Sequence, residues 1–230
     1  MNSQTYNREF YEGLRINNGH SAKFLAEYLV KKLDFSSVID IGCGNGDLLF
    51  SFFQMGLKNI KGIEGNDNYI IEKKPFSISI SNLEEPIISP IRYELAVCLE
   101  VAEHLEEKFA DNLIFTLTSA SDLVVFSAAI PGQGGTNHVN EQPPLYWASK
   151  FFERGYTLFL DPRHEIWKRK DIAAYYRQNI IVYRKCYETN PIFVEPKFMR
   201  HPEIFLSPLR RLYRLIIRIF RKLGLANNLK

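Results

Sequence analysis

The sequence predicts an α/β protein built on a doubly wound, parallel β-sheet. Segments typical of strands alternate with helical segments at the spacing of strand–helix units. Residues 123–130 (LVVFSAAI) are dominated by apolar side chains, as expected of a central strand that is buried on both faces. Residues 38–46 run from β-forming side chains into glycines at alternate positions, which indicates a buried strand that ends in a tight turn. This pattern predicts a ligand site at the carboxyl edge of the sheet.

The individual elements follow from hydrophobic periodicity. Residues 21–32 repeat apolar side chains at helical spacing, with Ser21 as the expected N-cap. Strands are expected at residues 38–41, 59–64, 76–80, 93–99, 123–130, 156–160 and 179–184. Helices are expected after residue 46, over residues 100–117 and near residues 145–154. Residues 131–144 form a connection of unusual length, and such long loops in compact domains are usually functional.

The composition is that of a soluble globular domain. The chain has 230 residues, of which 46% are hydrophobic and 24% charged, which suits one domain with a substantial core. No apolar run has the length that spans a bilayer, and the polar start lacks the apolar centre of a signal peptide. Cys43, Cys98 and Cys186 are scattered and odd in number, so we expect free thiols in a reducing cytoplasm.

The net charge of +3 is unevenly distributed. Residues 204–230 carry seven Lys or Arg side chains and no acid, which leaves 22 basic and 26 acidic side chains in residues 1–203. Because this larger part is mildly acidic, no nucleic-acid partner is expected. No compact set of Asp, Glu and His residues has the spacing of a metal site, so no metal is expected either.

The basic residues of the tail separate from its apolar residues on a helical wheel. Six cations of residues 209–223 fall within an arc of roughly 120°, and apolar side chains fill the rest. We therefore expect an amphipathic helix at residues 209–230, after a linker at residues 188–208. Such a helix suits the surface of an anionic membrane. The alternative is that its apolar face docks on the body of the protein or on a second subunit.

The turn after the first strand discriminates between ligands. Gly42, Gly44 and Gly46 alternate. A dinucleotide fingerprint would place its third glycine where Asp47 stands, and a phosphate-binding loop needs a Gly-Lys-Ser/Thr ending that is absent. Asp40 lies inside the strand end, two residues before the first glycine. An acid at this point disfavours an anionic ligand and favours one that carries a cationic amine.

This arrangement resembles the first motif of class I S-adenosylmethionine-dependent methyltransferases. Residues 81–86 (SNLEEP), 93–105 (YELAVCLEVAEHL) and 127–142 (SAAIPGQGGTNHVNEQ) extend the likeness. Residues 127–142, together with 146–147, 155–156, 166–167 and 176–179, resemble a bacterial subfamily of methyltransferase-domain proteins that is often met near glycosyltransferases, and the likeness covers about residues 6–184. It implies a Rossmann-like three-layer sandwich with seven mostly parallel strands, the last one antiparallel. It also implies that residues 1–187 form the methyltransferase domain, with the N-terminal segment as a lid.

The resemblance further implies S-adenosyl-L-methionine as the cofactor. Besides Asp40 and the glycines, Glu64 at the end of the second strand would accept hydrogen bonds from the ribose diol. Asn82 stands where the family has an acid at the adenine amine, with Leu83 beside it. The backbone at Leu99 and Glu100 would border the methionine part. The alternatives are that Glu64 is a surface acid and that Asn82 forms a plain turn.

The methyl acceptor is the least defined partner. A hydroxyl acceptor needs a base, and His138 in the long loop is the first candidate. His104 is a second candidate, although a structural role at a helix start is favoured for it. Asn140, Glu141 and Gln142 would suit a polyhydroxylated acceptor. The alternative is that His138 and Glu141 only hold the loop in place.

Two aromatic residues complete the candidate acceptor site. Tyr146 and Trp147 could form a wall against a sugar ring, but core packing is favoured for them. We therefore expect a cytoplasmic O-methyltransferase that acts on a glycan or glycolipid precursor at the inner membrane face. Methylation of a small metabolite or quinol is an alternative. From other classes, a non-catalytic S-adenosylmethionine-binding regulatory module and, less favoured, a nicotinamide oxidoreductase remain open.

Overall fold

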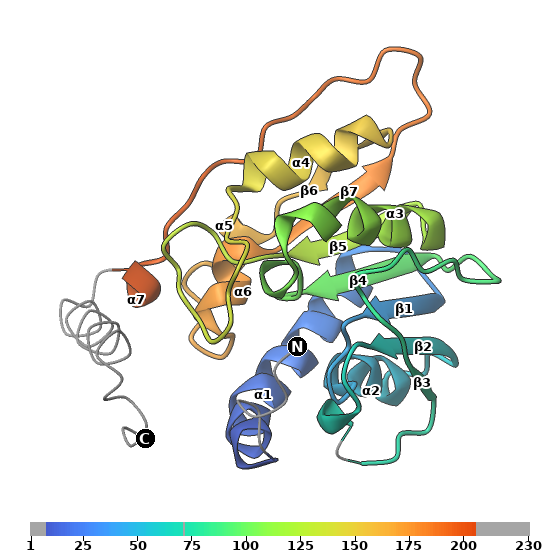
Figure 1. Ribbon diagram of the computed structural model, residues 1–230, viewed down its shortest axis with the longest axis vertical. Coiled ribbons are helices and arrows are strands. Elements are labelled where there is room, and N and C mark those ends of the chain that lie inside the picture. Colours follow the sequence, from blue (N-terminus) through green and yellow to red (C-terminus); the bar gives the residue numbers. More distant parts are fainter. Residues whose placement is uncertain (1–7, 71, 206–230) are drawn as a thin grey trace.

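The computed structural model describes residues 8–70 and 72–205, with side chains from residue 19 onward apart from Tyr69. Helices cover both faces of a seven-stranded sheet, which gives three layers (Figure 1). The strands are β1 (Ser37–Ile41), β2 (Asn59–Glu64), β3 (Ser77–Ile80), β4 (Leu95–Leu99), β5 (Leu123–Ser127), β6 (Tyr156–Leu160) and β7 (Ile181–Lys185). Their spatial order is β3-β2-β1-β4-β5-β7-β6. The predicted Rossmann-like sandwich is thereby confirmed.

Only the last strand in sequence runs against the others. β1 pairs in parallel with β2 and β4, and β3 and β5 extend the parallel part on either side. β7 inserts between β5 and β6 and is antiparallel to both. The strand order changes direction between β1 and β4, and ligands of such sheets bind at the carboxyl edge near this switch point.

The helices vary widely in length. The α-helices are α1 (Arg8–Lys32), α2 (Asp47–Gln54), α3 (Ala110–Ala120), α4 (Pro144–Glu153), α5 (Arg163–Ile166), α6 (Ala174–Asn179) and α7 (Pro202–Phe205). The described residues also include 3₁₀ turns at η1 (Asp67–Tyr69), η2 (Ala102–His104) and η3 (Glu107–Phe109). No helix among residues 8–70 and 72–205 combines the length and the apolar character needed to cross a bilayer.

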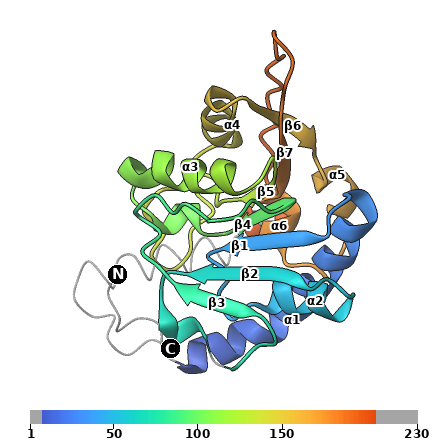
Figure 2. The same cartoon turned by 90° about the vertical axis from the view of Figure 1, so that its right-hand side faces the viewer.

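Alternating strand residues feed two hydrophobic cores. Ile39, Val124 and Phe126 point to the face covered by α3 and α4, where they pack with other buried apolar residues. Val38 and Val125 point to the opposite face, which α1 and α2 cover. Figure 2 shows these helix pairs on the two sides of the twisted sheet. Burial on both faces explains why the central strands read as continuous apolar runs.

Two predicted helix boundaries differ from the structure. The N-terminal helix begins at Arg8, so Ser21 lies inside it and is not an N-cap. Ser21 is fully buried, and its hydroxyl accepts a hydrogen bond from the Ala173 amide at 2.9 Å. The helix expected over residues 100–117 is interrupted: η2 and η3 precede α3, which begins only at Ala110. A left-handed φ of 55° at Glu100 is incompatible with a helix start at that point.

The segment predicted as a linker packs against the body in its described part. The Lys197 carbonyl accepts a hydrogen bond from the fully buried Arg163 at 2.9 Å. Arg177 forms an ion pair with Glu203, and His201 is 4% exposed. Phe193 also packs on Phe152, so residues 193–205 are a surface strap on the domain. The predicted helix at residues 209–230, and residues 1–7 of the predicted lid, lie outside the described residues.

Candidate functional site

The glycine turn lies at the carboxyl edge of the sheet, between β1 and α2. Gly42, Gly44 and Gly46 have φ angles of 77°, 54° and 74°, all in the left-handed region that favours glycine. The amides of Gly42 and Cys43 donate hydrogen bonds to the Ile63 carbonyl at 2.8 and 3.1 Å. The turn thus has the backbone that the alternating glycines predicted, and β2 holds it in place.

Packing also requires glycine at the first of these positions. A Cβ atom on Gly42 would lie 2.4 Å from Cγ2 of Val101, just after β4. This distance is far below the separation of about 3.5–4.0 Å at which carbon atoms attract each other. A side chain at Gly42 is therefore excluded by both its φ angle and its neighbour.

Glu64 reaches from the end of β2 to the glycine turn. Its side chain is 6% exposed, and its Oε2 accepts a hydrogen bond from the Gly44 amide at 2.7 Å. Its Oε1 accepts from the amides of Gly65 and Asn66 at 2.8 and 3.1 Å. Burial raises the pKa of Glu64, and the three hydrogen bonds oppose this shift. The residue is not a surface acid, and its oxygens retain acceptor capacity for a ligand hydroxyl.

Asp40 adds a second carboxylate under the turn. It lies in β1 opposite Gly62 of β2 and is 5% exposed. Burial and, to a lesser extent, the charge of Glu64 raise the pKa of Asp40 to about 8. Two buried carboxyl groups on neighbouring strands disfavour each other's ionised form, and a cationic ligand would favour ionisation.

Further carboxyl groups lie at the end of β4. Burial raises the pKa of the Cys98 thiol, and the charges of Asp40, Glu103, Glu100 and Glu64 raise it further. Four carboxylates from the ends of three adjacent strands therefore act on one buried thiol. The edge is poorly suited to a phosphate and well suited to a ligand that carries positive charge.

Glu100 holds a strained position at the exit of β4, next to Leu99. Its φ of 55° is uncommon for a residue with a side chain, and such strain concentrates at functional sites. The Glu100 amide donates to the Ser127 carbonyl at 3.0 Å. Its carboxylate accepts hydrogen bonds from Asn179 at 3.0 Å and from Gln133 at 3.3 Å. The structure therefore places Leu99 and Glu100 at the predicted edge and fixes the Glu100 side chain.

Glu100 belongs to a buried amide network that sequence reasoning missed. Gln178 Nε2 donates to Gln133 Oε1 at 2.7 Å, and Asn179 Nδ2 donates to the same oxygen at 3.0 Å. Gln178 Oε1 in turn accepts from the His201 amide at 2.7 Å. Because the members come from four separate segments, no local pattern reveals them. The network ties the exit of β4 to the long loop, α6 and the C-terminal strap.

Asn82 forms the plain turn that sequence analysis left open. Its side-chain oxygen accepts a hydrogen bond from the Glu84 amide at 3.1 Å, an arrangement typical of asparagine turns. Asn82 is exposed, whereas Leu83 is 6% exposed and packs beside Gly65. The second lone pair of the Asn82 oxygen is still available to an amine.

The long loop after β5 is closed by Glu141. Its carboxylate accepts hydrogen bonds from the amides of Gly132 and Gly134 at 2.9 and 2.5 Å. It also lies 2.9 Å from Nδ1 of His138. Burial raises the pKa of Glu141, but the hydrogen bonds from His138, Gly132 and Gly134 outweigh burial and lower it. Glu141 thus holds the loop in place, as one of the two interpretations of the sequence expected. Because Glu141 contacts only Nδ1 of His138, Nε2 can still accept a proton or bind a ligand.

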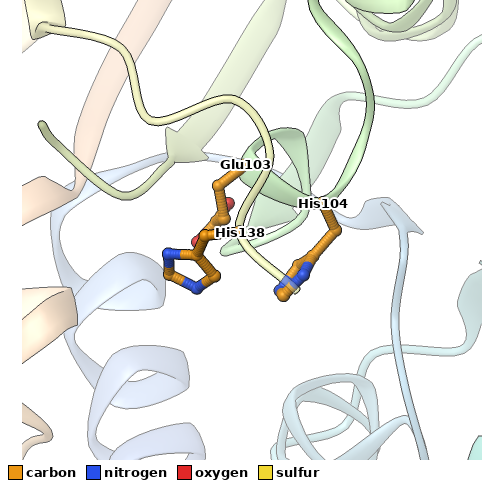
Figure 3. A group of neighbouring side chains, drawn as sticks. All are labelled: Glu103, His104 and His138. Carbon is orange, nitrogen blue, oxygen red and sulfur yellow. The ribbon is translucent and has the colours of Figure 1, made fainter. Parts of the chain in front are cut away.

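His138 lies against His104 and Glu103 of η2 (Figure 3). The two imidazole rings meet edge to face, with centroids 5.0 Å apart and an angle of 86°. Burial, and then the charge of His138, lower the pKa of His104 to about 4. The Glu103 carbonyl accepts hydrogen bonds from the amides of Val139 and Asn140 at 2.9 and 3.1 Å. This main-chain link joins residues that are more than 30 positions apart in sequence.

The remaining candidates divide between loop and core. Asn140 is 4% exposed, and its Oδ1 accepts a hydrogen bond from Gln142 at 2.9 Å. Trp147 is 2% exposed and packs on Phe126 with ring centroids 5.2 Å apart. Tyr146 is only partly buried and stacks edge to face on Trp147. Trp147 is thus a core residue, as sequence analysis favoured, and only Tyr146 of the pair reaches solvent.

The chain is similar to known proteins in its three-dimensional structure. No protein-family model matches the chain, and no curated protein matches it. Magnesium protoporphyrin IX methyltransferase (ChlM) from Synechocystis PCC 6803, solved with bound S-adenosylhomocysteine, is similar with a TM-score of 0.57 and 16% identity, over 80% of this chain and 90% of that one. The methyltransferase domain of bacterial CtHen1-C gives 0.54 and 20% identity, over 74% and 98%.

A third similar structure is the glycopeptide N-methyltransferase MtfA, with a TM-score of 0.51 and 10% identity, over 70% of this chain and 88% of that one. The ChlM enzyme has also been solved with bound S-adenosylmethionine. Magnesium protoporphyrin IX and a glycopeptide are different acceptors, so the likeness concerns the scaffold. The chain has the fold of the S-adenosylmethionine-dependent methyltransferases.

Proposed function

We propose that the protein is an S-adenosylmethionine-dependent O-methyltransferase. The observation that carries this proposal is the left-handed glycine turn with Glu64 bound across it and Asp40 buried beneath it. The cofactor has a cationic amine and a sulfonium, which complement the buried carboxylates, and a ribose diol, which complements Glu64. The fold, shared with methyltransferases solved with this cofactor, supports the assignment.

The cofactor supplies an activated methyl group, and the residues of the chain supply binding and orientation. Asp40 would accept from the amine, Glu64 from the ribose, and Leu99 and Glu100 would border the methionine part. Asn82 and Leu83 would lie at the adenine. Methyl transfer is an in-line displacement, so most of the rate enhancement comes from holding the acceptor oxygen about 3 Å from the methyl carbon.

We assign His138 as the base that accepts the proton of the acceptor hydroxyl when no metal ion is bound. Its Nδ1 is occupied by Glu141, which fixes the ring and leaves Nε2 as the free nitrogen. A positioned general base typically increases the reaction rate 10²–10⁴-fold. Removal of the hydroxyl proton as the oxygen attacks is the step that a sugar or alkyl alcohol needs.

For the acceptor we propose a glycan or glycolipid precursor at the cytoplasmic face of the membrane. The polar side chains of Asn140, Glu141 and Gln142 beside His138 suit a polyhydroxylated molecule, and Tyr146 offers a partly exposed ring. The basic tail of residues 209–230 supports a location at an anionic membrane surface. The resemblance to proteins met near glycosyltransferases points to the same substrate class.

Cofactor and acceptor are tested separately. Thermal shift of the purified chain should show stabilisation by S-adenosylmethionine and S-adenosylhomocysteine but not by NAD, which distinguishes a methyltransferase from an oxidoreductase. Mass spectrometry of native glycolipids from cells without the protein should show loss of a 14-dalton increment. An unchanged glycolipid profile would contradict the glycan assignment and favour a metabolite or quinol acceptor. Cofactor binding without any methylated product would favour a regulatory module.

The membrane assignment has its own test. A chain that ends at residue 208 should lose sedimentation with anionic vesicles while keeping its response to S-adenosylmethionine. If the shortened chain sediments as the full chain does, the tail does not hold the protein at the membrane.

A further inference from the structure

We propose that Glu103, His104 and His138 form a binding site for one divalent transition-metal ion. Each side chain offers one ligand atom, and these atoms lie within 4.8 Å of one another (Figure 3). Bonds of about 2.0–2.2 Å to one ion would place ligand atoms roughly 3–4 Å apart. The three groups therefore need to close by only about 1 Å, which small changes in side-chain torsion supply.

The state of Glu103 is the first independent observation. Its side chain is 1% exposed, and its Oε2 forms no hydrogen bond with any residue in the described part of the chain. A buried carboxylate oxygen without a donor is costly, because desolvation is not repaid. A cation bound at this oxygen would repay it. Glu100, which has hydrogen bonds from Asn179 and Gln133, lies close enough for its negative charge to act on Glu103, and this repulsion adds to the cost that a cation would relieve.

The second observation is the orientation of His138. A histidine that binds a metal usually donates its other ring N–H to a carboxylate, which fixes the ring and its tautomer. His138 has this arrangement, since Glu141 lies 2.9 Å from Nδ1 and leaves Nε2 for a ligand bond. Glu141 is itself held by two backbone amides, so the outer contact is rigid.

The backbone brings the ligands together before any ion arrives. The Glu103 carbonyl receives the amides of Val139 and Asn140, which anchors the loop one residue after His138 to the turn that carries Glu103 and His104. Gly135 provides the space for the His138 ring, since a Cβ atom there would lie 2.1 Å from Nε2. Ligands held on such a preformed frame lose little conformational entropy on binding.

The donor set indicates the class of ion. Two imidazole nitrogens and one carboxylate oxygen suit Zn²⁺, Co²⁺, Fe²⁺ or Mn²⁺, whereas Mg²⁺ and Ca²⁺ prefer oxygen ligands throughout. Three protein ligands leave positions open for an outside oxygen.

The role of the ion rests on the proposed function. The acceptor hydroxyl would bind at an open position, and the ion would increase its acidity. The oxygen then bonds to the methyl carbon as the carbon–sulfur bond breaks, and the hydroxyl proton leaves to water. His138 acts as a ligand in this state, and the ion takes over activation of the hydroxyl.

Direct binding measurements test the site without reference to catalysis. The untagged chain, treated with chelator and dialysed, is titrated with ZnCl₂, CoCl₂ and MgCl₂ by calorimetry, and Co²⁺ binding is followed by its visible absorption. We expect one equivalent of Zn²⁺ or Co²⁺ and at least tenfold weaker binding of Mg²⁺. Glu103→Gln should weaken Zn²⁺ binding at least tenfold. Glu107→Gln, the same change at an exposed position nearby, should leave it unchanged.

A second variant tests the same site in case Glu103→Gln does not fold. Gly135→Ala keeps all three ligands but displaces the His138 ring, and it should weaken Zn²⁺ binding at least tenfold. His164→Gln at an exposed histidine is the control for non-specific binding. Zn²⁺ binding that is absent from the wild-type chain, or that survives both Glu103→Gln and Gly135→Ala, would overturn the proposal.

The same samples separate this inference from the proposed function. Glu103→Gln should still bind S-adenosylmethionine, with a smaller loss of affinity than Asp40→Asn or Glu64→Gln causes, because Asp40 and Glu64 form that pocket. A chain that binds Zn²⁺ through Glu103 but not S-adenosylmethionine would refute the methyltransferase and keep the metal site. A chain that binds S-adenosylmethionine and transfers methyl groups equally well after chelation, with no Zn²⁺ equivalent, would refute only the metal site.

Discussion

Gly42 shows how one residue shapes the proposed cofactor pocket. Its φ angle lies in the left-handed region, and Val101 occupies the space where a side chain would begin. The alternating glycines in the sequence predicted the turn, but the contact with Val101 depends on the path of the chain after β4. A single methyl group here would disturb both the turn and the strand exit that faces it.

Alanine substitutions at Gly42 and Gly56 separate the effect of backbone strain from the effect of a steric clash with a neighbouring side chain. Gly42→Ala should lower stability by about 2–4 kcal/mol, since it combines left-handed strain with overpacking, and should weaken S-adenosylmethionine binding more than tenfold. Gly56→Ala has a φ of 102° but meets nothing within 4 Å, so it should cost only about 1–2 kcal/mol and leave affinity unchanged. Urea unfolding and calorimetry measure the two effects. Equal affinity in both variants would contradict the role of Gly42.

Asp40 makes the stability of the ligand-free chain depend on pH. Its pKa is about 8 in the folded chain, against 3.8 for the unperturbed group. The folded state therefore holds this proton more tightly than the unfolded state. The contribution of Asp40 is fully present below about pH 4 and is lost as pH rises towards 8.

Asp40→Asn should reduce the loss of stability between pH 5 and pH 8, because the amide cannot ionise. The measurement is the urea midpoint at each pH, and Asp34→Asn, at an exposed position in the same region, is the control. If Asp40→Asn and the wild-type chain lose stability in parallel over this range, Asp40 is not the buried proton-binding group.

At the scale of elements, the loop at residues 131–144 and the turn η2 form one unit. Glu141 closes the loop on itself, and the Glu103 carbonyl fastens it to η2. The sequence indicated that the loop was functional from its length and polarity. It did not reveal the contact between His138 and η2, because a contact between residues 34 positions apart leaves no periodic signal. The same limit explains why a helix was expected at residues 100–117, where Glu100 turns the chain instead.

Glu141→Gln tests the closure of this loop. The glutamine side chain retains one acceptor oxygen for the backbone amides of Gly132 and Gly134. It loses the hydrogen bonds to a charged carboxylate, each of which contributes about 1.5–3 kcal/mol. We expect amide hydrogen exchange in residues 132–142 to become at least tenfold faster, with little change in α3. Glu106→Gln, at an exposed position, is the control. Unchanged protection of the loop would show that Glu141 does not close it.

At the scale of the whole molecule, the seven mostly parallel strands and the antiparallel direction of β7 agree with the prediction. Apolar runs, turns and the resemblance are sufficient for this, although β1 pairs with β4 and β5 with β7 across strands that intervene in sequence. The strap at residues 193–205 was predicted as part of a linker, from the four prolines between residues 189 and 208. Its anchoring contacts involve Arg163 and Arg177, which are buried and bind the Lys197 carbonyl and Glu203. No sequence pattern marks an arginine as buried by a segment that lies 20 or more positions away.

Removal of the strap should therefore destabilise the domain. A chain that ends at residue 190 leaves Arg177 without Glu203 and Arg163 without the Lys197 carbonyl, at a cost of about 3 kcal/mol or more. Urea unfolding compares it with a chain that ends at residue 205, which keeps both contacts. Equal midpoints for the two chains would show that the strap is a linker after all.

The central claim is that an acidic, glycine-lined pocket binds S-adenosylmethionine, and isothermal titration calorimetry tests it most directly. The full-length chain should bind S-adenosylmethionine and S-adenosylhomocysteine and give no heat with NAD. Asp40→Asn and Glu64→Gln should each weaken binding at least tenfold, a loss of about 1.4 kcal/mol or more. Absence of any heat with S-adenosylmethionine and S-adenosylhomocysteine, for a chain that unfolds cooperatively, would contradict the account.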